Sequence, residues 1–169
     1  MSRDPIATNT WSEPINGLSG RLRVEFEDLG IGLRHAIHLE LRNHSSTPVA
    51  VINQPEVRAE LYDSSGRPVD TLGYPMSGPI PGAQWAAIPR DSYLGFRVDM
   101  QTVGVPTREQ GMALIAVGGR TWRVEAGTYV LETAVVFERR EEGPANQWVG
   151  ELELPPVEVV VTAQMLAPD

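Results

Sequence analysis

Three histidines and their acidic neighbours are the residues of this sequence that could support acid–base or metal chemistry. His38 and Glu40 stand two positions apart in an alternating segment, so both would face the same side of a strand and offer two metal ligands. A third ligand would have to come from another strand, and an exposed polar stripe is the favoured interpretation. His35 falls on the opposite, apolar face, where we expect a partly buried, hydrogen-bonded side chain. His44 follows the strand and is expected in a loop.

Motifs for nucleophilic catalysis and phosphate binding are missing from the sequence. It contains no Gly-x-Ser-x-Gly elbow and no calcium-binding loop of the EF-hand type. The run 63–66 (Asp-Ser-Ser-Gly) has the composition of a turn, in which Asp and Ser cap backbone groups. The pair Gly118–Gly119 is not followed by a helical pattern, so no phosphate cradle is expected. We therefore predict no catalytic residue, no cofactor and no metal, and we predict that the protein is not an enzyme.

The composition excludes further chemistry. The chain has 169 residues, all fourteen basic residues are Arg, and there is neither Lys nor Cys. Disulfides, thiolate zinc sites, iron–sulfur clusters, Cys nucleophiles and Schiff-base lysines are thereby ruled out. The formal net charge of −8 also argues against non-specific nucleic-acid binding, which needs clustered positive charge.

The hydropathy pattern that would position these residues has a period of two. Residues 21–27 and 33–43 alternate apolar with charged side chains, as half-buried strands do. No segment of ten or more residues carries a helical stripe. Two apolar runs flank Gly118–Gly119 and predict a tight hairpin. Further strands are expected at 57–62, 93–100, 112–117, 120–124, 128–139 and 147–163. These elements predict an all-β, antiparallel β-sandwich of seven to nine strands with little or no helix.

The domain boundaries follow from where the alternation begins and ends. We expect an N-terminal tail at 1–10, one domain at 11–163 and a C-terminal tail at 164–169. No apolar run has the length of a signal peptide or a membrane span, so we expect a soluble chain without membrane insertion. The compartment and the oligomeric state stay open, and an extracytoplasmic location would fit if an export signal had been removed.

One short motif is more specific than the alternation. The run 125–131 (Glu-Ala-Gly-Thr-Tyr-Val-Leu) resembles the tyrosine corner of immunoglobulin-like domains. The resemblance implies that the Tyr129 hydroxyl hydrogen-bonds backwards across the corner and that Gly127 permits a close backbone approach. Leu131 stands where antibody domains carry a cysteine. It would therefore fill the core site that a disulfide occupies in those domains.

A wider resemblance covers residues 11–161. The run 11–18 (Trp-Ser-Glu-Pro-Ile-Asn-Gly-Leu) and the segments 148–151 and 154–159 are similar to the ends of small immunoglobulin-like domains of planctomycete hypothetical proteins. The resemblance implies a bacterial protein with an immunoglobulin-like fold. It brings no activity and no catalytic residue with it.

The stretch 73–87 is the candidate binding segment. Its prolines and glycines alternate with Tyr74, Met76, Ile80 and Trp85, and a proline-stiffened loop loses little entropy when it binds a partner. The alternative is that these apolar groups fold back over an open end of the sandwich. We predict a non-enzymatic binding module whose partner is another protein. The competing hypotheses are a protease-inhibitor-like sandwich and a carbohydrate-binding module, which would need a row of coplanar exposed aromatic rings.

Overall fold

Antiparallel strands account for nearly all the regular structure. The computed structural model describes residues 10–28, 33–72, 84–99 and 111–166. Ten strands lie in these ranges: β1 (Leu18–Asp28), β2 (Leu33–Asn43), β3 (Val49–Ile52), β4 (Glu56–Tyr62), β5 (Trp85–Ile88), β6 (Tyr93–Arg97), β7 (Ala113–Val117), β8 (Arg120–Val124), β9 (Gly127–Phe137) and β10 (Gly150–Val161). One turn of 3-10 helix, η1 (Ala163–Met165), follows them. The predicted all-β class with little helix is confirmed.

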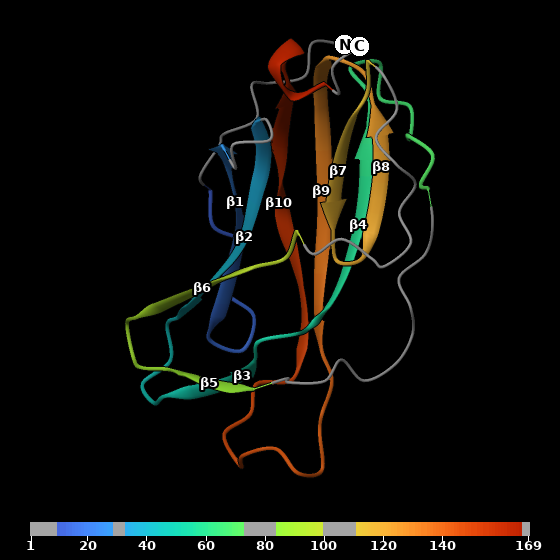
Figure 1. Cartoon of the computed structure of the whole chain (residues 1–169). Helices are drawn as coiled ribbons and strands as arrows, with labels where there is room; N and C mark the ends of the chain where they lie inside the picture. The colour runs from blue at the N-terminus through green and yellow to red at the C-terminus, as the bar shows by residue number, and fades with distance from the viewer. Residues whose placement is uncertain (1–9, 29–32, 73–83, 100–110, 167–169) are drawn as a thin grey trace.

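The strands form two three-stranded sheets and two short ribbons (Figure 1). The order is β1-β2-β6 in one sheet and β10-β9-β4 in the other, and the ribbons are β3-β5 and β7-β8.

Alternation along β1 and β2 decides which side of their sheet is buried. Leu22 lies opposite Leu39, and Val24 lies opposite Ile37, on the inner face. Leu22, Leu39 and Ile37 are almost fully buried, whereas the charged residues between them form the outer face. Because successive side chains of a strand point to opposite sides, this register follows directly from the period-two sequence pattern.

Side chains from both sheets meet in one continuous core. Leu39 and Leu41 of β2, Leu131 of β9 and Leu152 of β10 belong to the same cluster of buried residues. The two sheets are in close contact at Gly20, where an added Cβ would lie 2.7 Å from Leu154 Cδ2. A glycine there lets β1 pack directly against β10.

Turn chemistry explains two of the connections. Gly118 and Gly119 both have positive φ, 57° and 83°, and join β7 to β8 as a two-residue loop of the type I′ kind. The hairpin predicted from this glycine pair is confirmed. After β4, the carboxylate of Asp63 accepts hydrogen bonds from the backbone and hydroxyl of Ser65 and from the backbone of Arg67. These bonds, with that of the Ser65 hydroxyl the strongest, hold the pKa of Asp63 well below its usual range.

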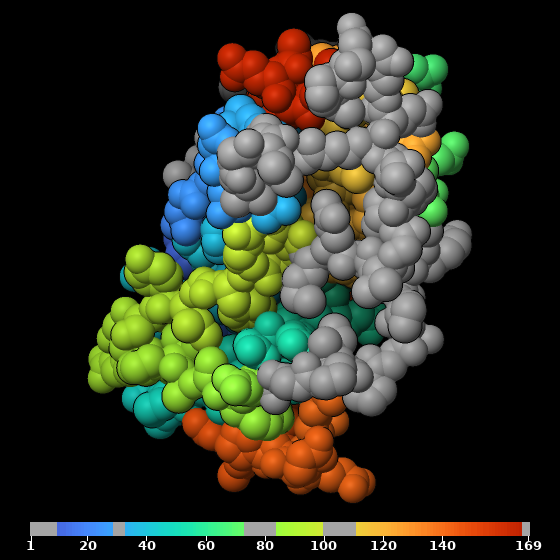
Figure 2. All heavy atoms as spheres, viewed as in Figure 1, coloured from blue at the N-terminus to red at the C-terminus, as the bar shows by residue number. Residues whose placement is uncertain are grey.

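The strand count exceeds the predicted seven to nine because of the β3-β5 ribbon. The three prolines within 73–87 predict irregular structure or an edge strand there, and the end of this stretch, from Trp85, pairs with β3 in a two-stranded ribbon. The pattern Trp-Ala-Ala-Ile shows no alternation, since alanine fits either face of a strand. Figure 2 shows residues 84–99 (yellow-green) across the front of the molecule, above the orange loop that follows β9.

The end of the chain packs against the body of the protein. Met165 and Leu166 lie in the predicted C-terminal tail, and both contact the hydrophobic core. The predicted N-terminal tail lies outside the described residues, apart from Thr10. The buried cluster runs from Leu18 in β1 to Val161 in β10, within the limits predicted for the single domain.

Candidate functional site

The histidines that could do chemistry lie apart from one another. His35 is 7% exposed on the inner face of β2, and its Nε2 lies 2.9 Å from the backbone oxygen of Val160 in β10. Burial lowers the pKa of His35, against a smaller upward effect of the hydrogen bond to Val160. The prediction of a partly buried, hydrogen-bonded histidine is confirmed. The ring joins the two sheets and contacts only Phe26 among the described aromatic residues, at 5.5 Å between centroids.

The His38 and Glu40 stripe is occupied by arginines. Glu40 is 5% exposed although it belongs to the outer face, and its two oxygens lie 2.7 Å from Arg21 Nε and 2.8 Å from Arg23 Nε. His38 Nδ1 lies 3.8 Å from Glu25 across the sheet. Within the described ranges, no group of three or more His, Asp or Glu side chains is arranged to hold a metal ion. Glu40 therefore serves as the acceptor for two guanidinium groups.

A serine and a histidine that the sequence analysis did not connect lie in hydrogen-bond contact. Ser19 Oγ is 2.8 Å from His44 Nε2, the distance of a nucleophile and its general base. Ser19 is fully buried, so its hydroxyl cannot meet a substrate from solution. Register pairing explains the contact, because β1 begins opposite the end of β2 and brings residues 25 positions apart together. The pair fastens the start of β1 to the loop after β2.

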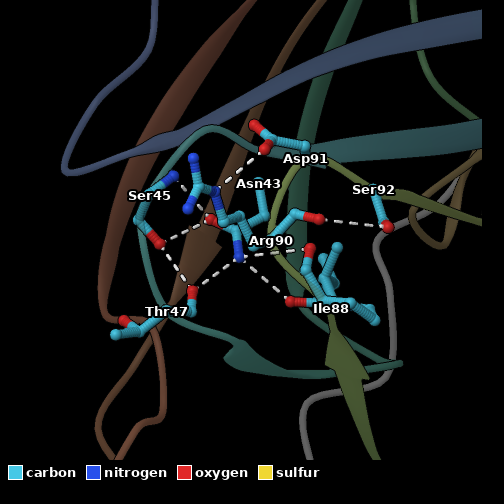
Figure 3. Close-up of polar contacts among 8 residues, drawn as sticks. Asn43, Ser45, Thr47, Ile88, Arg90, Asp91 and Ser92 are labelled. Atoms are coloured by element: carbon cyan, nitrogen blue, oxygen red, sulfur yellow. Dashed lines mark hydrogen bonds and ion pairs between the residues drawn. The ribbon is translucent and has the colours of Figure 1, made fainter.

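Asn43, the last residue of β2, lies at the centre of a network of hydrogen bonds (Figure 3). Its buried side-chain amide donates to the backbone oxygens of Thr47 and Ile88, and its Oδ1 accepts from the backbone and hydroxyl of Ser45. The backbone N–H of Asp91 also donates to the backbone oxygen of Asn43. Leaving such buried carbonyls unpaired costs about 1–3 kcal/mol each. Asn43 thus holds the loop after β2 against the β5–β6 connection.

The tyrosine-corner residues adopt the arrangement that the resemblance implies in two of three respects. The Tyr129 hydroxyl donates to the Glu125 oxygen at 3.0 Å, four residues back along the chain. Leu131 is fully buried in the core. A Cβ at Gly127 would lie 3.6 Å from Tyr129 Cε2, an ordinary contact distance, so the ring does not require a glycine there. Burial, with the Glu125 and Asp63 charges, raises the pKa of Tyr129.

The predicted binding segment is described at one of its four candidate residues. Trp85 is half-buried, packs against the core and lies close to Gly143, where an added Cβ would be 2.7 Å from the indole. Tyr74, Met76 and Ile80 lie outside the described residues. The structure therefore gives Trp85 a packing role in the β3-β5 ribbon, and the rest of the segment stays a prediction.

Charge is divided between the outer faces of the two sheets. The β1-β2-β6 face carries Arg21, Arg23, Arg34, Arg42 and Arg97, most of them paired with glutamates on the same face. The β10-β9-β4 face carries exposed glutamates at positions 56, 60, 132, 151, 153 and 158. Arg58 bridges Glu56 and Glu151, and Arg120 reaches Glu60. Among the described residues, Glu132, Glu153 and Glu158 have no ion-pair partner.

An open groove lies where the segment before β1 passes the edge of β10. Its volume is about 700 Å³, and its lining consists of Trp11, Ser12, Glu13, Ile15, Glu151, Glu153, Leu154 and Pro155. Ile15 is 42% exposed. Trp11 is held from the other side, because its ring lies 4.4 Å from the Arg21 guanidinium and edge-to-face with Tyr93. The groove thus combines a tryptophan ring, positioned by Arg21 and Tyr93, with the carboxylates of Glu13, Glu151 and Glu153.

The sequence marks both walls of the groove but does not show that they meet. The run 11–18 stands out as a motif, and the prolines at 155 and 156 interrupt the last strand. Nothing in the one-dimensional pattern tells which strand the first segment crosses. The contact depends on β1 packing against β10, which is a tertiary arrangement.

Comparison with protein-family models and with curated proteins found no match to this chain. Over the described ranges, no helix has the length and apolar character needed to cross a bilayer.

Proposed function

We propose that this protein is a non-enzymatic protein-interaction module built on an immunoglobulin-like sandwich, and that the groove between residues 11–15 and β10 is its binding surface. The observation that carries the proposal is the composition of this groove. The exposed Ile15 and the partly buried Trp11 and Pro155 line it beside carboxylates, which is the combination of anchor and polar rim found at recognition surfaces.

The immunoglobulin-like part of the proposal is supported by strand order and by one corner. In immunoglobulin sandwiches, strands A, B and E share one sheet and strands G, F and C share the other. The orders β1-β2-β6 and β10-β9-β4 match these two orders, and β9, in the place of strand F, begins at the Tyr129 corner. The kinship with the domains of planctomycete proteins stays a prediction.

The non-enzymatic part is supported by how the reactive groups are used. Glu40 is engaged by two arginines, His35 by a backbone oxygen, and the Ser19 hydroxyl is buried. An enzyme needs an acid, a base and a nucleophile that converge on a space open to substrate. The described residues around the groove are apolar or carboxylate side chains and one serine, with no histidine.

The competing hypotheses receive less support from the described residues. A carbohydrate-binding module would present a flat row of aromatic rings, but Trp11 and Tyr93 meet at 68° and Phe26 lies at the far end of β1. A protease-inhibitor-like role needs a rigid exposed loop to enter a protease, and the segment 73–83 that could provide one lies outside the described residues.

In-cell photocrosslinking tests the proposal. A photoreactive phenylalanine analogue replaces Ile15 in the groove, Tyr74 in the predicted loop, or, as a control, the exposed Phe26 of β1, which does not line the groove. Crosslinked proteins are identified by mass spectrometry, purified and titrated against the unmodified protein by calorimetry. We expect a defined partner at position 15 that binds the purified chain with 1:1 stoichiometry.

Each outcome bears on the proposal. A partner that crosslinks only at position 74 would move the surface to the loop and overturn the groove assignment. A partner that proves to be a protease inhibited by the chain would favour the inhibitor hypothesis. If neither position 15 nor position 74 gives a partner that binds in calorimetry, the interaction-module proposal fails.

A further inference from the structure

The backbone of β10 has an available edge in the groove. β10 is the last strand of its sheet and pairs only with β9. On its other side, residues 150–155 make no backbone hydrogen bond with the described residues. The edge of β1 beside the groove is already hydrogen-bonded at Gly20. The backbone N–H of Ser12 donates to the Gly20 oxygen at 2.8 Å, and the Ser12 hydroxyl accepts from the Gly20 N–H. A strand entering the groove would therefore pair with β10.

The length of that edge is limited by two prolines. Pro155 and Pro156 lack backbone N–H groups, and the register of β10 against β9 shifts between Leu154 and Val157. The continuous edge therefore runs from Gly150 to Leu154. A segment of about five residues in extended conformation matches this length at one partner residue per position.

The carboxylates at the groove fix the sign of the occupant's charge. Glu13 on one wall and Glu153 on the other have no ion-pair partner among the described residues. The third carboxylate, Glu151, forms an exposed ion pair with Arg58 at 3.5 Å, and a cationic side chain of a ligand could take the place of Arg58. The net charge of −8 adds a long-range attraction for cationic segments.

The apolar lining of the groove indicates where apolar residues of the occupant would lie. Trp11, Ile15 and Leu154 face the same space as the carboxylates, but Leu154 belongs to the inner side of β10 and Glu153 to the outer side. An added strand shares this alternation, so every second side chain would lie on the apolar side and the others beside the glutamates.

We infer that the groove binds an extended segment of a partner protein with alternating basic and apolar residues, which adds to β10 as an edge strand. The inference rests on the proposed interaction function and names the chemistry of the partner. A segment this short buries less surface than a standard interface, so it forms a weak, reversible complex unless other contacts add to it.

Peptide binding to the full chain tests the inference. The probe is a fluorescent seven-residue peptide of alternating arginine and valine, titrated by fluorescence anisotropy at physiological salt. The comparison peptides have glutamate in place of arginine, or the same residues with the arginines grouped at one end. We expect both to bind at least about ten-fold more weakly, the first through charge and the second through lost alternation.

Variants of the chain locate the site. Glu13→Gln with Glu153→Gln removes the unpaired carboxylates of the groove and should weaken the alternating peptide about five- to ten-fold. Glu132→Gln with Glu158→Gln is the matched control, because these exposed glutamates on the same sheet are also unpaired and do not line the groove. The control should change the dissociation constant less than two-fold. Two further peptides are N-methylated at the arginines or at the valines, which blocks one edge of the strand or the other. The peptide whose blocked edge faces β10 should lose binding, and the other should keep it.

Equal weakening by the two double variants would show attraction to the acidic face as a whole and overturn the inference, as would undiminished binding of both N-methylated peptides. If the partner crosslinked at position 15 binds while no alternating peptide does, the interaction function stands and the strand-addition chemistry fails. If neither binds, both fail.

Discussion

At the scale of single residues, the outer face of β1-β2-β6 shows how neighbours decide the role of a titratable group. Glu40 is nearly inaccessible on a face that the sequence pattern assigns to solvent, because Arg21 and Arg23 lie over it. Gly95 lies opposite Glu40 on β6 and has no side chain to push it outwards. A carboxylate held by two guanidinium groups is a poor candidate for a metal ligand, since binding a cation would separate it from both.

His35 should make the stability of the protein depend on pH. Its pKa in the folded state lies below the unfolded value of about 6.5, because the ring is buried. Between the two values the unfolded chain binds more protons, so the free energy of unfolding falls as the pH drops through 6.5 and levels off below the folded pKa. Urea denaturation at pH 7.5 and pH 5.5 measures the difference.

Two variants separate His35 from the other titrating groups. We expect His35→Gln to reduce the loss of stability between the two pH values, whereas His44→Gln should leave the contribution of His35 in place. His44 is exposed and contacts Ser19 in the loop after β2. If His35→Gln shows the same pH dependence as the unmodified chain, protonation of His35 does not control it.

At the scale of elements, the turn between β7 and β8 is constrained by its backbone and by its surroundings. Gly118 has φ of 57°, and a Cβ at this position would lie 2.6 Å from the Val57 oxygen and 2.6 Å from its Cβ. A backbone atom cannot move aside as the tip of a side chain can. The hairpin therefore depends on the absence of a side chain at Gly118 in order to pack against β4.

We predict that Gly118→Ala destabilises the protein more than Gly111→Ala. Gly111 also has positive φ, 71°, but no atom lies within 4 Å of the position its Cβ would take. Gly111→Ala should cost about 1–2 kcal/mol for the left-handed conformation alone, and Gly118→Ala should cost at least about 1 kcal/mol more. Urea unfolding curves provide the comparison. Equal losses would mean that β4 yields to the added methyl group.

Strand length separates the elements that could be predicted from those that could not. The eleven residues of β2 carry five inward apolar or histidine positions, and its predicted bounds match the observed ones. The four residues of β3 and β5 are too few for a period to appear, and they form a ribbon because Val51 and Ile88 are buried together in the core. Such short strands depend on tertiary partners.

At the scale of the whole molecule, the edges and faces determine how it meets other chains. The outer face of β1-β2-β6 neutralises most of its own charge through cross-strand ion pairs, whereas the β10-β9-β4 face keeps unpaired glutamates. The acidic face borders the groove through Glu151 and Glu153. Like charges on this face oppose its contact with a second copy, and the same charges attract a basic segment.

The prolines of β10 should limit self-association through its edge. An edge strand with a complete row of N–H groups pairs readily with other chains, and proline interrupts that row. We predict that replacing Pro155 and Pro156 together by threonine shifts the chain toward larger assemblies at equal concentration. Size-exclusion chromatography with light scattering measures the shift. Pro48→Thr, in an exposed loop, is the control, and a double variant with an unchanged mass distribution would contradict the prediction.

The sequence by itself determined the all-β class, the existence of the long strands, the bounds of β2 and the hairpin at Gly118–Gly119, because alternation and turn chemistry act over a few neighbouring residues. The tertiary structure alone decided that Ser19 meets His44, that Glu40 is enclosed by arginines, and that residues 11–15 and β10 form a groove. These contacts join positions from about twenty to well over a hundred residues apart, and they depend on how whole strands pair and pack.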